Sequence, residues 1–217
     1  EVRPEARPGS RWWWLGSAVD KDNLNYNLKE YGKAGLGSLE VTPIYGVKGN
    51  KSHNIRFLSP EWMEMFRYTQ EVGKTNGIDI DMNTGTGWPF GGPEVSLSQA
   101  AAKAIFECYE VKGGESVKLE IDIRDTKEEK QRDVACLDCL MAYGADGKVV
   151  NLTRKVKDGY LQWDAPTGDW KLVALFVGRT FQKVKRAAPG GEGYVMDHFS
   201  PMAVKSYFEK FDKAFKT

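Results

Sequence analysis

Acidic and amide side chains alternate with apolar ones in two short segments, 39–45 (LEVTPIY) and 78–83 (IDIDMN). The polar positions that share one face of these segments are Glu40, Thr42, Asp79, Asp81 and Asn83. Because successive side chains of a β-strand point to opposite faces, we expect these polar groups to face the interior of an α/β barrel. A carboxylate in such a place is costly unless it binds a ligand or is paired. Glu40 and Asp81 are therefore either substrate-binding groups or carboxylates that satisfy buried backbone or arginine groups.

A glycine-rich loop follows the second segment and carries one tryptophan, Trp88. Its sequence, TGTGWPFGGP (84–93), has neither the GxGxxG nor the P-loop spacing, and no lysine stands where a phosphate-binding loop requires one. An aromatic ring just beyond a strand end suits the apolar face of a sugar ring. We therefore interpret Trp88 as a substrate platform. The alternative is that Trp88 and Phe90 only plug the mouth of the barrel.

Three further residues could line the same mouth. Tyr45 ends the first of the two segments, and Asp197 and His198 lie in a later strand-like segment, YVMDHFS (194–200). Asp197 and His198 point to opposite faces of a strand, so only one of them can enter the mouth. For His198 the alternatives are a ligand to sugar hydroxyls, an acid or base, and a hydrogen-bonded core histidine. The carboxylates from which a catalytic pair could be drawn are Glu40, Asp79, Asp81, Glu192 and Asp197.

The composition excludes several classes of function. The 217 residues include 31 Lys and Arg and 30 Asp and Glu, which gives a formal net charge of +1. This balance does not indicate a basic surface for binding nucleic acid. Hydrophobic residues make up 41% and charged residues interrupt every apolar run, which predicts a folded chain without a membrane span. The three cysteines are too few for a disulfide scaffold. Cys136 and Cys139 form a Cys-x-x-Cys pair with no partners at metal-binding spacing, so we expect packing roles.

Strand-then-helix segments occur at least three times and predict a parallel sheet. The expected helices begin at the caps Asp20, Ser59 and Ser200, and the first two end at Gly35 and Gly77. In the middle of the chain, period-two alternation and glycine turns predict antiparallel β structure instead. The expected divisions are an extended arm at 1–10, the first βα units of a barrel at 11–103, a β-sandwich-like insertion at 104–188, and a further βα unit at 189–217.

Five blocks of the sequence, taken in order, resemble the N-terminal half of the catalytic region of glycoside hydrolase family 106, the α-L-rhamnosidases. They are WWWLGSAVDKDNL, LEVTPIYGVKG, FLSPEWMEM, DMNTGTGWPFGGP and GEGYVMDHFS. The fourth is the most specific, because so many glycines, prolines and aromatics rarely coincide by accident. The resemblance implies a (β/α)8 TIM-type barrel with β-domain insertions. Because the sequence holds about four βα units, we expect an α/β fold with a partial barrel and an antiparallel β-sandwich-like insertion.

The resemblance also implies a function. It points to a bacterial protein, secreted, periplasmic or on the outer surface, that removes terminal α-L-rhamnose from pectic glycans by an inverting mechanism supported by Ca2+. Inversion requires an acid and a base whose carboxyl groups are roughly 6.5 to 9.5 Å apart. In the family these are glutamates of later strands, which this sequence does not contain. We therefore expect the chain to be inactive alone, with a rhamnose-terminated glycan and the remaining half of the barrel as partners.

Two other functions stay open at this stage. The first is a non-catalytic carbohydrate-binding module, in which the β insertion and Trp88 carry the affinity. The second is a different barrel hydrolase that uses Glu40 and Asp81 with a divalent cation. Because no histidine pair accompanies these carboxylates, only hard cations such as calcium or magnesium would suit the second.

Overall fold

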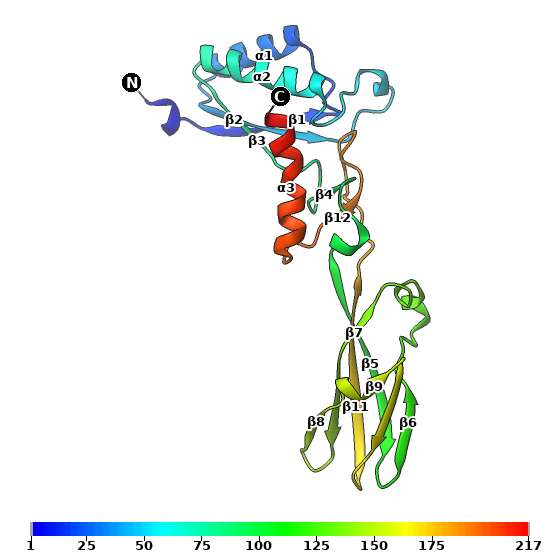
Figure 1. The fold of residues 1–217 in the computed structure, drawn as a ribbon. Helices are drawn as coiled ribbons and strands as arrows, with labels where there is room; N and C mark the ends of the chain where they lie inside the picture. The colour runs from blue at the N-terminus through cyan, green and yellow to red at the C-terminus, as the bar shows by residue number, and fades with distance from the viewer. Residues whose placement is uncertain (1, 217) are drawn as a thin grey trace. The chain divides into compact units, whose positions relative to one another are not determined.

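The computed structural model describes residues 2–216 of the chain and divides into two compact units (Figure 1). The first, called here the α/β unit, comprises Glu1–Ala101 and Phe181–Thr217, and the second, the β unit, is Ala102–Thr180. The insertion expected from the sequence extends to residue 188, whereas the β unit ends at Thr180. Residues 181–188 lie in the α/β unit because their backbone bonds to the glycine-rich loop, with Ala188 N–H donating to the carbonyl of Thr86 at 3.0 Å.

A three-stranded parallel sheet forms the centre of the α/β unit. Its strands are β1 (Gly9–Leu15), β2 (Ser38–Ile44) and β3 (Asp79–Met82), in that order. Helix α1 (Lys21–Lys33) connects β1 to β2 and α2 (Pro60–Thr75) connects β2 to β3, and both cover the same face of the sheet (Figure 1). These helices do not cover the other face of the sheet, which carries the polar side chains that alternate along the strands.

The helix caps predicted from the sequence are confirmed. The Asp20 carboxylate accepts the Asn23 N–H at 2.8 Å, and the Ser59 hydroxyl accepts the Trp62 N–H at 3.2 Å. Ser200 likewise caps α3 (Pro201–Phe215) through the Ala203 N–H at 3.3 Å. These bonds satisfy amide groups that the first turn of a helix leaves without partners.

Aromatic side chains dominate the core beneath these helices. Trp14, Trp62, Tyr207 and Phe211 are buried together with Val41 of the central strand. Trp62 and Phe66 stack at a centroid distance of 5.3 Å, and the Trp62 indole N–H donates to the buried Ser17 hydroxyl at 3.0 Å. The long C-terminal helix therefore shares one core with the first two helices.

The prediction of a further parallel strand near the C-terminus is wrong. Strand β12 (Tyr194–Val195) is short and pairs antiparallel with β4 (Gly91–Gly92), outside the parallel sheet. The pairing depends on glycine, because a Cβ at Gly91 would lie 2.0 Å from the Tyr194 carbonyl oxygen. Over the described residues the sheet thus has three parallel strands and does not close, so the structure is a mixed α/β fold without a barrel.

The extended arm expected at 1–10 is also shorter than predicted. A 3₁₀ turn spans Pro4–Ala6, and Gly9 and Ser10 already belong to β1, where they pair with Ser38 and Leu39. Glu1 lies outside the described residues. The other short 3₁₀ turns of this unit are Lys51–His53 and Leu97–Gln99.

The β unit consists of two antiparallel sheets. The larger contains, in spatial order, β5 (Ala102–Lys112), β11 (Asp169–Arg179), β7 (Cys136–Gly144) and β8 (Val149–Asn151). The smaller contains β6 (Ser116–Glu120), β10 (Tyr160–Asp164) and β9 (Val156–Lys157). Their inward residues form a core that is separate from that of the α/β unit, and fully buried members include Leu140, Leu161 and Leu172. The 3₁₀ turns Thr126–Gln131 and Thr153–Lys155 complete the unit.

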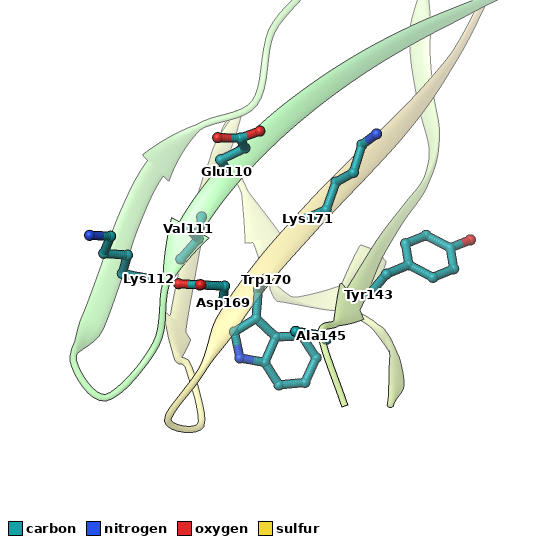
Figure 2. Close-up of a pocket in the computed structure, with 9 residues that line it drawn as sticks. Glu110, Val111, Lys112, Tyr143, Ala145, Asp169, Trp170 and Lys171 are labelled. Carbon is teal, nitrogen blue, oxygen red and sulfur yellow. The ribbon is translucent and has the colours of Figure 1, made fainter. Parts of the chain in front are cut away.

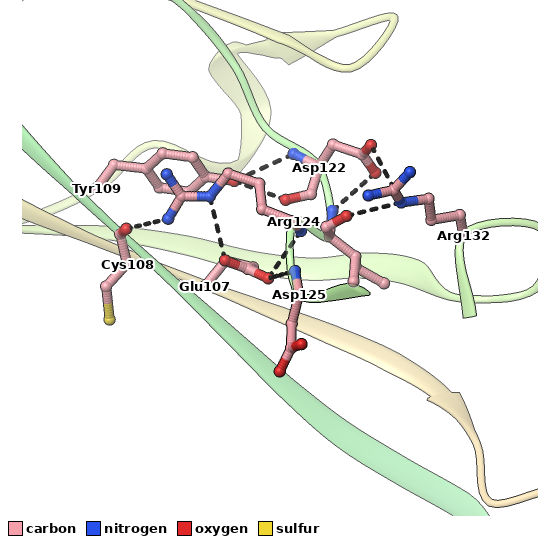
Figure 3. Close-up of polar contacts among 8 residues, drawn as sticks. Glu107, Cys108, Tyr109, Asp122, Arg124, Asp125 and Arg132 are labelled. Atoms are coloured by element: carbon pink, nitrogen blue, oxygen red, sulfur yellow. Dashed lines mark hydrogen bonds and ion pairs between the residues drawn. The ribbon is translucent and has the colours of Figure 1, made fainter. Parts of the chain in front are cut away.

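A polar network fastens the segment after β6 to β5 (Figure 3). The buried Glu107 carboxylate accepts the backbone N–H groups of Arg124 and Asp125 at 2.8 and 3.2 Å and the Arg124 Nε–H at 3.2 Å. The Tyr109 hydroxyl donates to the Asp122 carbonyl at 2.8 Å, and burial raises the pKa of this hydroxyl. Every oxygen of Glu107 has a donor, so we assign this cluster a structural role.

Candidate functional site

The open face of the parallel sheet brings Arg11, Glu40 and Asp81 into one row, because these residues are paired across β1, β2 and β3. The Arg11 Nε–H donates to Glu40 Oε2 at 2.8 Å, with both side chains partly exposed. A shallow cavity of about 430 Å³ lies over the row. Its lining residues are Gly9, Ser10, Arg11, Ser38, Glu40 and Asp81.

Asn83 connects this row to the glycine-rich loop. Its Nδ2–H donates to Glu40 Oε1 at 3.3 Å, and its Oδ1 accepts the Gly85 N–H at 2.8 Å. Both oxygens of Glu40 are therefore occupied, which matches the interpretation in which arginine satisfies this carboxylate. The Asp81 carboxylate, by contrast, has no hydrogen bond or ion pair within the part of the chain that the structure describes.

Trp88 makes an edge-to-face contact with Trp13 of β1, with ring centroids 5.7 Å apart. The backbone of Trp88 is held by two hydrogen bonds with Lys185, of 3.0 and 3.1 Å, and a Cβ at Gly87 would lie 2.2 Å from the Lys185 oxygen. Trp13 is 45% exposed, and the Arg11 guanidinium lies 5.4 Å from its ring centroid. The two indoles thus form an aromatic pair on the open face.

Trp13 is a residue of the open face that was not predicted from the sequence as a candidate binding residue. It stands in a run of three tryptophans, which we interpreted only as a bulky apolar strand. The two neighbours of Trp13 pack on the helix-covered face, where Trp14 is 1% exposed. Strand alternation alone would have assigned the middle tryptophan to the opposite face.

The other predicted residues are less closely connected to this face. Tyr45 follows β2, is 45% exposed, and its N–H donates to the Arg186 carbonyl at 3.0 Å. Asp197 caps a turn by accepting the Phe199 N–H at 3.0 Å, and the adjacent His198 is exposed. Strand β12 ends at Val195, so Asp197 and His198 do not lie in a strand. The expectation that one of these two side chains enters a barrel mouth assumed strand alternation and therefore does not apply.

The two remaining candidate carboxylates, Asp79 and Glu192, do not line the cavity over Arg11, Glu40 and Asp81. Asp79 is exposed at the start of β3. Glu192 accepts the Gly190 N–H at 2.9 Å within a turn. The structure therefore brings Glu40, Asn83 and Asp81 together on one face, adds the Trp13 and Trp88 pair to that face, and connects neither Asp79 nor Glu192 to them by a hydrogen bond.

A buried anchor fixes the start of the glycine-rich loop to α3. The Tyr207 hydroxyl donates to the Thr84 carbonyl at 2.6 Å, and burial raises the pKa of that hydroxyl. The Lys210 ammonium forms an ion pair with Glu94 and lies 3.8 Å from the Tyr207 ring centroid. Burial lowers the pKa of Lys210, although the Glu94 carboxylate acts in the opposite direction.

Metal ligation is not supported by these side chains. Over residues 2–216, no three His, Cys, Asp or Glu side chains converge on a point where they could hold an ion. Glu40 and Asp81 alone do not form such a cluster. Within the same residues, no helix is both long and apolar enough to cross a membrane.

The open face combines a partly exposed aromatic pair with amide, guanidinium and carboxylate groups, which is typical of proteins that bind carbohydrates. The comparison with protein families defines the class more closely. The chain belongs to glycoside hydrolase family 106, described as α-L-rhamnosidase, whose model matches residues 2–146 and 142–217. The family suspected from the sequence blocks is thereby confirmed.

Two individual proteins are similar to the chain. The solved structure of a rhamnosidase from Novosphingobium sp. PP1Y matches it over its whole length with a TM-score of 0.68, at 14% identity, and the chain covers 37% of that structure. A "Putative beta-glucuronidase" of Formosa agariphila is 24% identical over an alignment of 243 residues, which covers 95% of this chain and 21% of that protein. The chain thus spans about a fifth of the curated relative and little more than a third of the solved structure.

Proposed function

We propose that this chain supplies substrate-contacting groups to a glycoside hydrolase that releases terminal α-L-rhamnose from pectic or other plant glycans. The observation that carries the proposal is the Trp13 and Trp88 pair on the open face, which also carries the Arg11 guanidinium and the Asp81 carboxylate. Aromatic rings stack on the apolar face of a pyranose, and charged side chains hydrogen-bond its hydroxyls. Family membership makes an α-L-rhamnoside the first ligand to test.

We further propose that the catalytic acid and base lie outside the described residues. Glu40 is a poor candidate for the acid, because Arg11 and Asn83 donate to its two oxygens. An acid needs a free oxygen from which to protonate the leaving group, and inversion needs a second carboxylate across a gap that admits water. Accordingly, this chain alone would bind a rhamnoside without hydrolysing it.

The open sheet supports a proposal about the rest of the fold. Strands β1 and β3 are the edges of the parallel sheet within the described residues, and one face of that sheet is not covered by helices. Parallel strands are ordinarily buried on both faces. We propose that the α/β unit is part of a larger (β/α)8 barrel, with the remaining strands as its partner. The same family background favours a bacterial protein that is secreted, periplasmic or on the outer surface.

The proposed function is tested by measuring binding and turnover separately. Saturation-transfer NMR with methyl α-L-rhamnoside should detect binding by the chain, and Trp88→Ala should weaken it about tenfold through loss of the aromatic platform. Tyr26→Ala, which removes an aromatic side chain that is 64% exposed on α1, is the matched control and should bind normally. An aryl α-L-rhamnoside should not be hydrolysed.

Two results would contradict the proposal. If Trp88→Ala bound the rhamnoside as tightly as the unmodified chain, the aromatic pair would have no part in recognition. If the purified chain hydrolysed the aryl rhamnoside at ordinary enzyme rates, roughly 1 to 1,000 per second, the acid and base would have to lie within this chain.

A further inference from the structure

A cavity that is lined by charged and aromatic side chains lies on the β unit. It has a volume of about 660 Å³ and opens where β5, β11 and β7 run side by side (Figure 2). Glu110, Lys171 and Tyr143 form a row across these three strands, because Lys171 is paired with both of the others. Asp169 and Lys112 form the next row. The cavity is therefore lined by two adjacent rows of one sheet.

The polar side chains of this cavity are available to a ligand. Within the described residues, none of the carboxylates and ammonium groups of Glu110, Lys112, Asp169 and Lys171 forms an ion pair or a side-chain hydrogen bond, and the Tyr143 hydroxyl is equally free. Tyr143 is also 44% exposed, so its ring can be reached. Donors, acceptors and an aromatic ring thus surround one space that could hold a small ligand.

The inner face of the sheet beneath these groups is closely packed. The Trp170 indole is buried, donates its N–H to the Pro166 carbonyl at 2.8 Å, and meets Trp163 edge to face at 5.1 Å. Gly144 stands directly over this indole, and a Cβ there would lie 3.1 Å from the ring and 2.7 Å from the Asp146 carboxylate. A side chain at Gly144 would therefore collide with the core on the inner face of the sheet, opposite the face on which Tyr143 is exposed.

The charges of the cavity indicate the class of ligand. Two carboxylates and two ammonium groups line it, so its formal net charge is zero. An anionic ligand would meet Glu110 and Asp169, and a cationic one would meet Lys112 and Lys171. A neutral ligand rich in hydroxyl groups can bond to both kinds of side chain while one of its faces packs on the tyrosine ring.

We propose that this cavity is a sugar-binding subsite for neutral residues of a glycan chain, carried by the β unit. The proposal rests on the function proposed above, since it assumes that the protein acts on glycans. It adds a place of contact on the β unit for neutral sugars other than the terminal rhamnose. An oligosaccharide would then bind to the β unit through its internal residues, whereas a rhamnose monosaccharide would not.

Tyr160 provides a matched control for Tyr143. It is 43% exposed and lies on β10 of the smaller sheet. Its hydroxyl donates to Glu120 at 3.4 Å, and the Lys118 ammonium lies 5.7 Å from its ring centroid. The two tyrosines have the same exposure, but Tyr160 already contacts neighbours of its own sheet.

The experiment uses the full chain and a neutral, rhamnose-terminated tetrasaccharide, with binding measured by calorimetry and by saturation-transfer NMR. Tyr143→Ala should weaken binding of the tetrasaccharide about tenfold, whereas Tyr160→Ala should leave it unchanged. Lys171→Ala, an exposed change with little risk to folding, should weaken it several-fold. Methyl α-L-rhamnoside should bind Tyr143→Ala as well as the unmodified chain, because the terminal sugar contacts the other unit.

The outcomes separate this inference from the proposed function. If Tyr143→Ala and Lys171→Ala bind the tetrasaccharide normally, or if Tyr160→Ala loses as much affinity as Tyr143→Ala, the subsite is wrong while the function stands. If Trp88→Ala fails to weaken monosaccharide binding but Tyr143→Ala still weakens that of the tetrasaccharide, the function as proposed is wrong and the β unit is itself a carbohydrate-binding module. Failure of the unmodified chain to bind the tetrasaccharide would overturn the subsite.

Discussion

Glu40 shows how a residue that could do chemistry can instead be held by its neighbours. Arg11 and Asn83 occupy its two oxygens, but the ion pair is open to solvent, with the Arg11 side chain 44% and the Glu40 side chain 35% exposed. Ion pairs at this exposure contribute about 0 to 1 kcal/mol to folding. The value of Glu40 to the protein would therefore lie in the position it gives to Arg11 and Asn83.

We predict that Glu40→Gln lowers the free energy of unfolding by less than about 1 kcal/mol, because the amide still bonds to one neighbour and the lost ion pair is solvent-exposed. Urea denaturation followed by tryptophan fluorescence would measure this difference. Arg11→Gln, which removes the other partner, should have an effect of the same size. A loss above about 3 kcal/mol in either variant would show that the row is a structural centre and would contradict our interpretation.

Lys210 gives a prediction about pH, because burial lowers its pKa below the ordinary value of 10.5. Between the lowered pKa and 10.5 the unfolded chain binds more protons than the folded one, so stability contributed by this group rises with pH. The raised pKa of Tyr207 acts in the opposite sense only above about pH 10. Calorimetry between pH 8 and 10 should therefore show a rise in Tm that is smaller in Lys210→Met, and an identical slope in the two proteins would refute the assignment.

The family resemblance implies calcium, and we propose that any calcium used in the family's mechanism is bound by groups outside residues 2–216. Within those residues, no three His, Cys, Asp or Glu side chains form a cluster that could hold an ion. We predict that 5 mM calcium and 5 mM chelator give the same Tm to within about 1 °C, since a bound ion would stabilise the folded state by mass action. A calcium-dependent rise of several degrees would place a site in this chain.

At the scale of elements, the sequence predicts local features well and long-range pairing poorly. Caps at Asp20, Ser59 and Ser200 are visible because a capping side chain and the amide it accepts are three residues apart. The partner of β12 could not be predicted, because it depends on two glycines about 100 residues earlier in the chain. The same limit explains the candidate site: alternation shows which face Glu40 uses, but not that Lys185 holds Trp88 against Trp13.

Gly73 lies where helix α2 approaches the sheet closely. In helix α2, a Cβ at this position would lie 2.7 Å from the Ile80 side chain and 2.9 Å from the Ile78 carbonyl oxygen. Alanine is favoured over glycine within helices by about 1 kcal/mol, but forcing atoms into a filled contact costs about 1 to 3 kcal/mol. Backbone cannot easily move away, so the second effect should be the larger.

We therefore predict that Gly73→Ala lowers the free energy of unfolding by up to about 2 kcal/mol, the difference between these effects. Thermal unfolding monitored by circular dichroism would measure it. Glu71→Ala, at an exposed position of the same helix, should change stability by less than about 0.5 kcal/mol. A more stable Gly73→Ala protein would mean that α2 can shift away from β3.

At the scale of the whole molecule, each unit has its own hydrophobic core. Trp14, Val41 and Trp62 belong to the core of the α/β unit, whereas Leu140 and Leu172 belong to that of the β unit, and the two clusters share no residue. The change from strand-and-helix segments to period-two alternation already indicated two kinds of packing in the sequence. A loss of packing in one core should then be felt first in its own unit.

Leu172→Ala tests this independence, because Leu172 is fully buried in the β unit. Replacing such a side chain costs about 2 to 5 kcal/mol. Hydrogen exchange followed by mass spectrometry should show faster exchange in β5, β7 and β11, while the protection of β1 and β2 stays unchanged, because these strands are supported by the other core. Trp14→Ala should give the reverse pattern. If either variant raised exchange equally in both units, the two cores would unfold as one cooperative structure, and the β unit could not act as a separate carrier of a sugar-binding subsite.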